Sequence, residues 1–258
     1  MKRNTPHPIS RRWLGWWLAA LPLCAALAGH AAEVSVAVAS NFSAPMARIA
    51  AAFEQDTGHK ALLSTGSTGK FYAQIRNGAP FQVLLAADQE TPARLEQEGL
   101  TVPGSRSTYA IGRLVLWSRQ SGLVDARGEV LRRGNFERLA MADPRLAPYG
   151  AAALEVMNKL GVWPALQAKV VQGENISTAY QWVSTGNAAL GFVALSQVMS
   201  EGRMGEGSAW LVPPDLHAPM RQDAVVLLPG KDSVAASALM RYLKGERARQ
   251  IMRGYGYE

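Results

Sequence analysis

The chain has 258 residues and a formal net charge of +7, from 27 basic and 20 acidic residues. Four basic residues and no acidic residue fall within the first 31 positions, so the remaining 227 residues carry 23 basic against 20 acidic side chains, a net charge of +3. So small an excess gives no reason to expect nucleic-acid binding, and a chain of this length can bury a core as one large or two small domains.

The first 31 residues have the layout of a secretory signal peptide. A basic segment is followed by an almost wholly apolar run over residues 13–27 and then by small residues with cleavage-site spacing. The alternative is a membrane anchor, but the apolar run is shorter than the roughly 20 residues that a span needs. We therefore expect residues 1–31 to be removed on export. The only cysteine, Cys24, lies in this segment, so the exported part has no thiol.

The residues after position 31 alternate between strand-like and helix-like hydrophobic patterns. In the first part, apolar or alternating runs predict three strands, and each is followed by a segment with helical spacing. Gly58 follows the first helix, where a glycine with positive φ often ends a helix. The predicted order is strand 34–38, helix 43–55, strand 61–63, a helix to residue 75, strand 83–87 and helix 91–98.

A second region begins with the long apolar segment 109–118 and repeats the same alternation. Its predicted elements are strand 139–142, helix 149–160, strand 169–171, helix 176–185, strand 190–193 and a further helix. A late strand at 224–228 and helices at 233–243 and 246–253 close the chain. Strands and helices that alternate at these lengths predict an α/β fold with mostly parallel sheets.

We expect two lobes rather than one sheet. The segments near 109–118 and 224–228 are natural crossings, which assigns residues 32–112 and 229–258 to a discontinuous first lobe and residues 113–228 to the second. In open α/β sheets, ligands bind beyond the carboxyl ends of the strands. Two such lobes that face each other would form a cleft.

Candidates for catalysis or metal binding are few. The exported part has two histidines, His59 and His217, which lie far apart in sequence, so neither a Ser-His-Asp triad nor a histidine metal site is indicated. Asp88 and Asp143 each follow a predicted strand, and we interpret both as caps of turns or helices. We therefore expect no enzyme, no catalytic residue and no site for a free metal ion.

The segment GSTGK at residues 66–70 looks like part of a phosphate-binding loop but departs from its pattern. A P-loop has four residues between its glycines and a serine or threonine after its lysine, whereas Gly66 and Gly69 are two residues apart and Phe71 follows Lys70. Nucleotide binding is therefore not predicted. The segment is either an ordinary turn with a capping residue or a site for another anion.

Four loops share one character that favours a small anion. Each places hydroxyl, amide or free backbone N–H groups at the start of a helix, where the helix dipole is positive. The simpler interpretation of any one loop is helix capping, but four loops in the topological position of a ligand site favour an oxyanion. They are residues 40–41, 67–69, 148–150 and 175–178.

Six segments carry a resemblance to a known family: VAVASNF (36–42), GSTGKFYAQIRNGAPF (66–81), AAD (86–88), ADPRLAPYGAAALEVMNKLGVW (142–163), ENISTAYQWVSTGNAALGFV (174–193) and YLKGERARQIMRGYGY (242–257). Through them the sequence resembles the molybdate-binding proteins of bacterial ABC importers. The resemblance implies a two-lobed periplasmic-binding-protein fold, in which two mostly parallel sheets flanked by helices are joined by two crossing segments.

The resemblance also implies a function. We expect a monomer without a cofactor that captures molybdate or tungstate in the periplasm and delivers it to the membrane permease of an ABC importer. The alternative is another tetrahedral oxyanion, such as sulfate or phosphate, in the same architecture. Sulfate and molybdate carry the same charge and differ mainly in size, and the sequence does not state the volume of the site.

The resemblance further implies that neutral donors from both lobes hold the oxyanion. Carried over residue by residue, these are Ser40, Asn41, Ser67, Thr68, Tyr149 and the backbone N–H of Ile176. Many relatives have a ligand-binding tyrosine at the position of Ala194 and a small residue at the position of Tyr149, so this chain is similar to a subgroup in which the phenol has changed place. Gln82 stands where relatives usually have aspartate, but it precedes a strand and bears little on the ligand.

Overall fold

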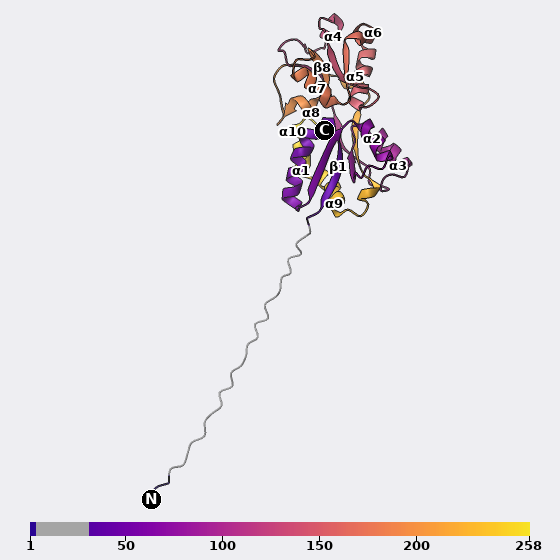
Figure 1. The fold of residues 1–258 in the computed structure, drawn as a ribbon. Helices are drawn as coiled ribbons and strands as arrows, with labels where there is room; N and C mark the ends of the chain where they lie inside the picture. The colour runs from indigo at the N-terminus through magenta and orange to yellow at the C-terminus, as the bar shows by residue number, and fades with distance from the viewer. Residues whose placement is uncertain (4–30) are drawn as a thin grey trace. The chain divides into compact units, whose positions relative to one another are not determined.

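Two five-stranded sheets organise residues 31–258 (Figure 1). The computed structural model describes these residues and residues 1–3, so the predicted signal peptide lies almost entirely outside the described residues. Residues 31–258 form one compact unit. In the described part of the chain, no helix combines the length and the apolar character needed to cross a membrane.

The first sheet has the strand order β2-β1-β3-β12-β4. Its strands are β1 (Glu33–Ala39), β2 (Lys60–Gly66), β3 (Val83–Leu85), β4 (Ser107–Gly112) and β12 (Met220–Val226). β1 pairs in parallel with β2 and β3, whereas β12 pairs antiparallel with β3 and β4. Because three parallel strands end at one edge, the residues that follow them come close together there.

Helices cover both faces of the first sheet, which explains why β1 is apolar on both sides. On one face, Val36 packs in a core with Phe53 and Leu239; on the other, Ala37 packs with Phe71 and Leu95. The first face is covered by α1 (Ser43–Thr57), α9 (Val234–Leu243) and α10 (Glu246–Gly254), and the second by α2 (Thr68–Arg76) and α3 (Glu90–Gln97). Gly58 ends α1 with φ 72°, as predicted.

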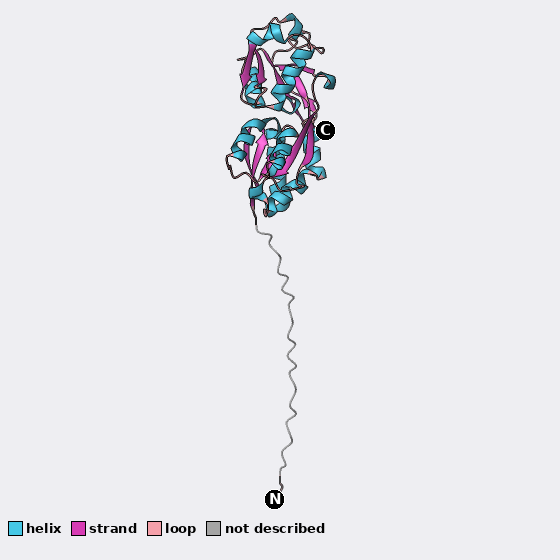
Figure 2. Ribbon diagram, turned by 90° about the vertical axis from the view of Figure 1, so that its right-hand side faces the viewer, coloured by secondary structure: helices cyan, strands magenta, loops and turns pink. Residues whose placement is uncertain are grey.

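The second sheet has the order β11-β5-β8-β6-β7, and Figure 2 shows its strands flanked by helices. Its strands are β5 (Leu114–Ser118), β6 (Leu139–Ala142), β7 (Val170–Gly173), β8 (Leu190–Ala194) and β11 (Ser208–Leu211). β6 pairs in parallel with β7 and β8, whereas β5 pairs antiparallel with β8 and β11. The predicted α/β fold with two mostly parallel sheets is confirmed.

The remaining elements of the described chain are short or lie on the second sheet. The helices are α4 (Val130–Arg133), α5 (Pro148–Lys159), α6 (Trp163–Leu166), α7 (Ile176–Ser184) and α8 (Leu195–Val198), and a small hairpin joins β9 (Met199–Ser200) and β10 (Arg203–Met204). The 3₁₀ turns are η1 (Ser40–Phe42), η2 (Gln167–Lys169), η3 (Pro214–Leu216) and η4 (Leu228–Gly230).

The crossings between the lobes differ from the prediction. The predicted strand 109–118 is two strands, β4 and β5, which lie in different sheets with Arg113 between them. The predicted second lobe, residues 113–228, ends too late, because β12 lies between β3 and β4 in the first sheet. The chain therefore returns to the first lobe between β11 and β12. The physical reason for the error is that an apolar central strand suits either sheet, and its pairing partners are remote in sequence.

Candidate functional site

A small cavity lies where the carboxyl ends of β1 and β2 meet the first residues of α5 and α7. It is lined by Ala39, Ser40, Asn41, Gly66, Ser67, Thr68, Ala87, Ala147, Pro148, Tyr149 and Ile176. The structure thus brings together all six residues that the sequence resemblance singles out. The cavity has a volume of only about 10 Å³, far below the roughly 300 Å³ at which pockets for drug-sized molecules begin. It suits a ligand of few atoms.

Two hydrogen bonds join the lobes next to the residues that line the cavity. The N–H of Gly69, in the first turn of α2, donates to the carbonyl of Leu146 at 2.9 Å. The hydroxyl of Ser177, in α7, donates to the carbonyl of Ser40 at 3.3 Å. A ligand in this cavity would therefore touch both lobes at once.

Ser40 begins the 3₁₀ turn that joins β1 directly to α1. This tight connection keeps its side chain at the strand's end, where it is only 6% exposed. Its carbonyl accepts a hydrogen bond from the Ser43 hydroxyl at 2.9 Å. Within the described part of the chain, no hydrogen-bond partner meets the Ser40 hydroxyl itself, so this group is available to a ligand.

Ser67 and Thr68 start α2 and have different local partners. The Ser67 Oγ caps the helix by accepting from the Lys70 N–H at 3.4 Å. The Thr68 Oγ1 accepts from the N–H of Ala87, which follows β3, at 3.0 Å. A hydroxyl that already accepts a hydrogen bond keeps its own proton for another acceptor. Both hydroxyls can therefore donate into the cavity, and Thr68 is oriented for it by a backbone group of the neighbouring strand.

Tyr149 is the second residue of α5, after Pro148 at the first helical position. Its hydroxyl accepts from Nε2 of Gln222 at 3.2 Å. Burial raises the pKa of Tyr149 well above its usual value of 10.0, so the phenol stays protonated and can act as a donor. Its contact with a ligand stays a prediction.

Ile176 occupies the first position of α7, behind the capping residue Asn175. The Asn175 Oδ1 accepts from the N–H groups of Ser177 at 2.9 Å and Thr178 at 3.1 Å. This cap satisfies the second and third amides of the helix, and the first amide of a helix has no partner within it. The Ile176 N–H thus remains for a ligand in the cavity, as the resemblance implies.

Asn41 lines the cavity, but its side-chain amide is directed elsewhere. Its Nδ2 donates to Oε1 of Gln222 at 3.0 Å and to the Tyr257 hydroxyl at 2.9 Å, which uses both of its hydrogens. A direct donation from this amide to a ligand, as the sequence resemblance suggests, does not fit this arrangement. Asn41 instead connects the cavity wall to buried groups behind it.

The walls of the cavity carry no charged side chain. Lys70, the one cation of the GSTGK segment, forms an ion pair with Glu174 of the second lobe. The favourable potential for an anion comes instead from the positive ends of α2, α5 and α7, whose first residues line the cavity. Among the described residues, no group of histidine, cysteine and carboxylate side chains is arranged to hold a metal ion.

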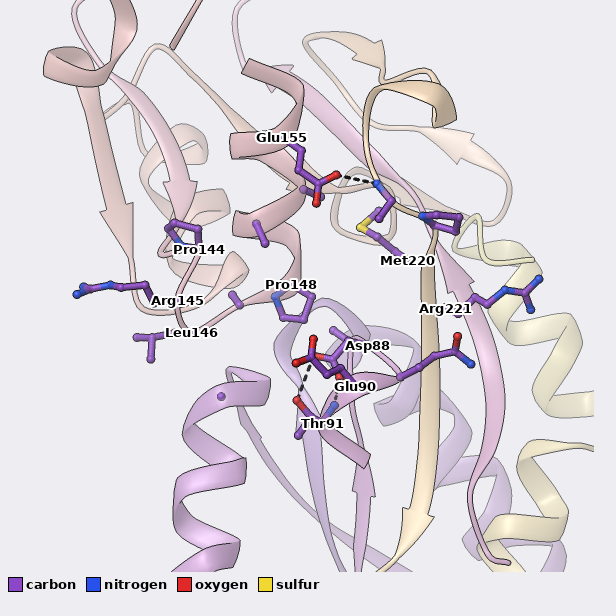
Figure 3. A pocket seen from close by; sticks show the side chains of 18 residues that line it. Asp88, Glu90, Thr91, Pro144, Arg145, Leu146, Pro148, Glu155, Met220 and Arg221 are labelled. Carbon is purple, nitrogen blue, oxygen red and sulfur yellow. Dashed lines mark hydrogen bonds between the residues drawn. The ribbon is translucent and has the colours of Figure 1, made fainter. Parts of the chain in front are cut away.

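A larger groove of about 440 Å³ lies beside the cavity (Figure 3). It is lined by Asp88 and by Pro144 and Arg145, the two residues that follow Asp143. Asp88 accepts from the N–H of Thr91 at 2.9 Å, and Asp143 pairs with Arg145 at 2.7 Å. Asp143 also accepts from the Arg145 N–H at 2.9 Å, so both carboxylates cap local turns, as predicted. Burial raises the pKa of Asp88, whereas the Arg145 side chain lowers the pKa of Asp143.

The sequence reasoning missed two residues next to the site. Gln222, in β12, and Tyr257, at the carboxyl terminus, are both buried and both bond to Asn41. In the sequence Gln222 stands between Arg221 and Asp223, so nothing there indicates that its side chain is buried or what its amide contacts. Tyr257 lies in a segment that carries the resemblance, without an assigned role.

Comparison with known proteins agrees with this geometry. A family profile described as "Bacterial extracellular solute-binding protein" matches residues 34–258. The molybdate-binding protein ModA of Azotobacter vinelandii is 58% identical over 232 residues, which cover 90% of this chain and 92% of that protein. The molybdate-binding protein ModA of Rhodobacter capsulatus is 50% identical over 238 residues, with coverages of 92% and 93%.

Solved structures show the same fold. The Azotobacter vinelandii periplasmic molybdate-binding protein superposes with a TM-score of 0.85 at 38% identity, over 88% of this chain and 99% of that chain. The sulfate-binding protein SubI of Mycobacterium tuberculosis superposes with a TM-score of 0.68 at 14% identity, over 88% and 86%. The second likeness concerns the fold alone.

Proposed function

The chain belongs to the bacterial extracellular solute-binding protein family, and we propose that it captures molybdate or tungstate between its lobes and delivers the oxyanion to the permease of an ABC importer. It acts in the periplasm as a monomer, without catalysis and without a cofactor. The observation that carries this proposal is the convergence of neutral donors from both lobes on one small cavity. The leader-like first 31 residues and the names of the two similar ModA proteins support it.

Neutral donors are sufficient to hold a dianion. A hydrogen bond to a charged group contributes about 1.5–3 kcal/mol. Five to seven such bonds, after the costs of ordering and desolvation, reach the roughly −8 to −12 kcal/mol that corresponds to micromolar to nanomolar binding. The donors assigned to the first lobe are Ser40, Ser67 and Thr68, and those assigned to the second are Tyr149 and the Ile176 N–H.

The direction of the hydrogen bonds favours an anion without a proton. The hydroxyl oxygen of Thr68 already accepts from Ala87, and that of Tyr149 already accepts from Gln222. These groups therefore present protons to the cavity rather than lone pairs. Phosphate at neutral pH carries at least one proton and would need an acceptor, so the site disfavours it. Sulfate needs none, and it is discriminated by the size of the site.

Calorimetric titration of the purified protein with molybdate, tungstate, sulfate and phosphate tests the proposal. We expect dissociation constants of roughly micromolar or below for molybdate and tungstate, and values at least about a hundredfold higher for sulfate and phosphate. Submicromolar binding of sulfate or phosphate without binding of molybdate would overturn the proposal. A scattering measurement with and without molybdate would show whether the ligand closes the two lobes.

A further inference from the structure

Gln222 links groups of both lobes behind the cavity, and its side chain is fully buried. Its Oε1 accepts from Asn41 Nδ2 at 3.0 Å and from the Tyr109 hydroxyl at 2.9 Å. Its Nε2 donates to the Tyr149 hydroxyl at 3.2 Å. Tyr149 belongs to the second lobe, whereas the other three residues belong to the first. The amide thus joins the lobes at the back of the site.

A backbone carbonyl sets the direction of this chain of hydrogen bonds. The Tyr257 hydroxyl has two acceptors for its single proton, the Asn41 carbonyl oxygen at 2.9 Å and the Ser196 Oγ at 3.0 Å. The Ser196 hydroxyl donates to the same carbonyl at 2.7 Å, so its proton is also used. The Tyr257 oxygen is therefore an acceptor toward the Asn41 side chain, which must face it with Nδ2.

The same reasoning extends to Tyr149. Because Asn41 presents Nδ2 to Gln222, the Gln222 atom that meets it must be Oε1, and Nε2 is left to face Tyr149. The Tyr149 oxygen is then an acceptor toward Gln222, and its own proton must be donated elsewhere. The orientation of both amides thus follows from a group that cannot change its role.

The Tyr149 proton needs an acceptor. A ligand in the cavity that Tyr149 lines would supply one. A hydrogen bond to an ionised acceptor is roughly twice as strong as one between neutral groups. A bound dianion therefore takes the proton.

Gly112, at the end of β4, leaves room for this arrangement. A Cβ atom at this position would lie 2.1 Å from the Tyr149 hydroxyl and 2.4 Å from Gln222 Nε2. Both distances are far below van der Waals contact, so any other residue here would displace the phenol or the amide. The crossing between the lobes thus has the shape that the contact between Gln222 and Tyr149 needs.

We propose that Gln222 is a positioning residue: by donating to Tyr149, it commits the Tyr149 hydroxyl to donate to the bound oxyanion. This inference rests on the proposed function, since it assigns a role toward the same ligand. Tyr257 acts further back and keeps Asn41, and through it Gln222, in the orientation that makes this donation possible. Neither residue touches the ligand itself.

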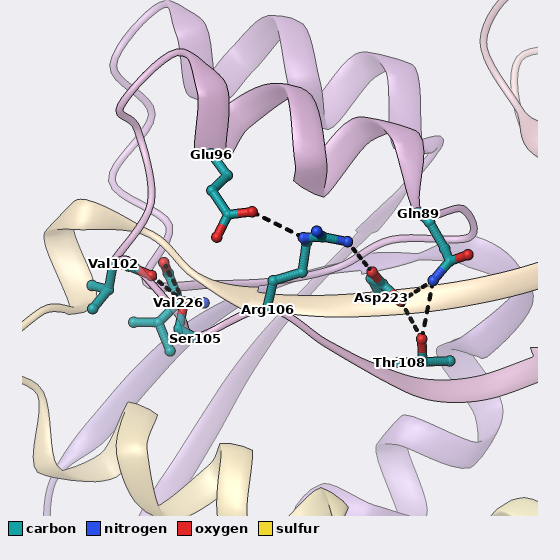
Figure 4. A network of polar contacts seen from close by, with 8 residues as sticks. All are labelled: Gln89, Glu96, Val102, Ser105, Arg106, Thr108, Asp223 and Val226. Carbon is teal, nitrogen blue, oxygen red and sulfur yellow. Dashed lines mark hydrogen bonds and ion pairs between the residues drawn. The ribbon is translucent and has the colours of Figure 1, made fainter.

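The charged side chains near β12 bond to one another and to Thr108, and not to Gln222. The neighbouring Asp223 pairs with Arg106 at 2.9 Å and accepts from the Thr108 hydroxyl at 2.6 Å (Figure 4). The register of β12 against β4 shifts between Gln222 and Asp223. The Gln222 side chain bonds to the Asn41 amide and to the hydroxyls of Tyr109 and Tyr149, so no ion pair accounts for its orientation.

A double-mutant cycle tests the proposal by calorimetry with molybdate. Gln222→Met removes the donor with little change in volume, and we expect molybdate affinity to fall about threefold to tenfold. In the Tyr149→Phe background the same change should alter affinity less than about twofold, because there is no hydroxyl to orient. The fall in melting temperature should be similar in both backgrounds, since Asn41 and Tyr109 lose an acceptor in each. This difference separates positioning from a purely structural role.

Gln82→Met is the matched control. Gln82 precedes β3, at the opposite end of the sheet from the cavity, and its Oε1 accepts from the Ser35 N–H at 3.0 Å. Its replacement should leave molybdate affinity unchanged. If Gln222→Met fails to fold, Tyr257→Phe carries the same test, because it removes the proton that sets the direction and should also lose its effect in the Tyr149→Phe background.

The outcomes separate the two proposals. An unaltered protein that does not bind molybdate contradicts the proposed function, whatever the variants do. A parent that binds molybdate, together with equal affinity losses for Gln222→Met with and without the Tyr149 hydroxyl, contradicts the positioning role alone. An absence of any loss contradicts it as well.

Discussion

Lys70 forms its ion pair with Glu174, a residue of the other lobe, and does not line the cavity. Both side chains are about half exposed, at 43% and 55%, and such surface pairs contribute about 0–1 kcal/mol. We therefore expect Lys70→Gln to change molybdate affinity less than about fivefold. Glu174→Gln is the control and should have an equally small effect. A loss of two orders of magnitude in calorimetry, for Lys70→Gln alone, would mean that the ammonium group contacts the ligand.

Tyr149→Phe removes one donor from the cavity and keeps the aromatic ring. Because a hydrogen bond to a charged group contributes about 1.5–3 kcal/mol, the dissociation constant for molybdate should rise roughly tenfold to a hundredfold. Tyr180→Phe is the control in the same lobe, since the Tyr180 ring stacks on Trp117 outside the cavity. A Tyr149→Phe protein that binds as tightly as its parent would show that the hydroxyl is not a ligand.

Thr68 combines a structural hydrogen bond with a predicted ligand contact. Thr68→Val keeps the shape but removes the acceptor of the buried Ala87 N–H, and an unsatisfied buried donor costs about 1–3 kcal/mol. We expect both a lower melting temperature and an affinity for molybdate at least about tenfold lower. Thr68→Ser restores the hydroxyl and should remain within about threefold of the parent. Equal affinities of the Val and Ser variants would exclude Thr68 as a donor.

Gly112→Ala places a methyl group where the Tyr149 hydroxyl and Gln222 Nε2 now lie. The Tyr149 phenol and the Gln222 amide must move away from the new methyl group. We therefore expect a lower melting temperature and weaker molybdate binding. Gly205→Ala is the control, because its Cβ would meet its nearest neighbour, the Val198 carbonyl, at an ordinary 3.5 Å. Calorimetry and thermal unfolding of both variants are the measurements. A Gly112→Ala protein unchanged in both properties would contradict the tight packing seen here.

Because of Asp88, the free energy of unfolding should fall as pH rises through the titration range of this carboxyl group. Burial raises its pKa in the folded protein above 3.8, so between 3.8 and the raised value the folded state binds more protons than the unfolded state. Stability must therefore fall as pH rises through this window. Asp88→Asn keeps an oxygen to cap Thr91 and cannot ionise. In urea unfolding, the free energy of unfolding of the Asp88→Asn variant, relative to that of the parent, should increase as pH rises from 3.8 to the raised pKa of Asp88. A difference that stays constant from pH 3.5 to 8, roughly the range set by the ordinary pKa of aspartate and neutrality, would contradict this reading.

Local signals in the sequence determined most of the elements and the loops at the site, and the family resemblance supplied the individual residues. The apolar run of β1, the glycine that ends α1 and the capping positions of Ser67 and Asn175 each depend on a few neighbouring residues. Their patterns are therefore visible in the sequence. The carboxyl ends of parallel strands meet at one edge by topology. The sequence alone therefore sufficed to place Ser40 and Thr68 together.

Tertiary structure decided what the sequence could not express. β12 joins the first sheet because of pairings with strands far away in the chain, and a buried apolar strand has no local mark of its partners. The Asn41 amide points to Gln222 and Tyr257, 181 and 216 residues away, rather than into the cavity. The direction of a hydrogen bond depends on every donor and acceptor around it. Whether Tyr149 gives its proton to a ligand is therefore a property of the assembled network, in which a carbonyl at one end constrains a phenol at the other.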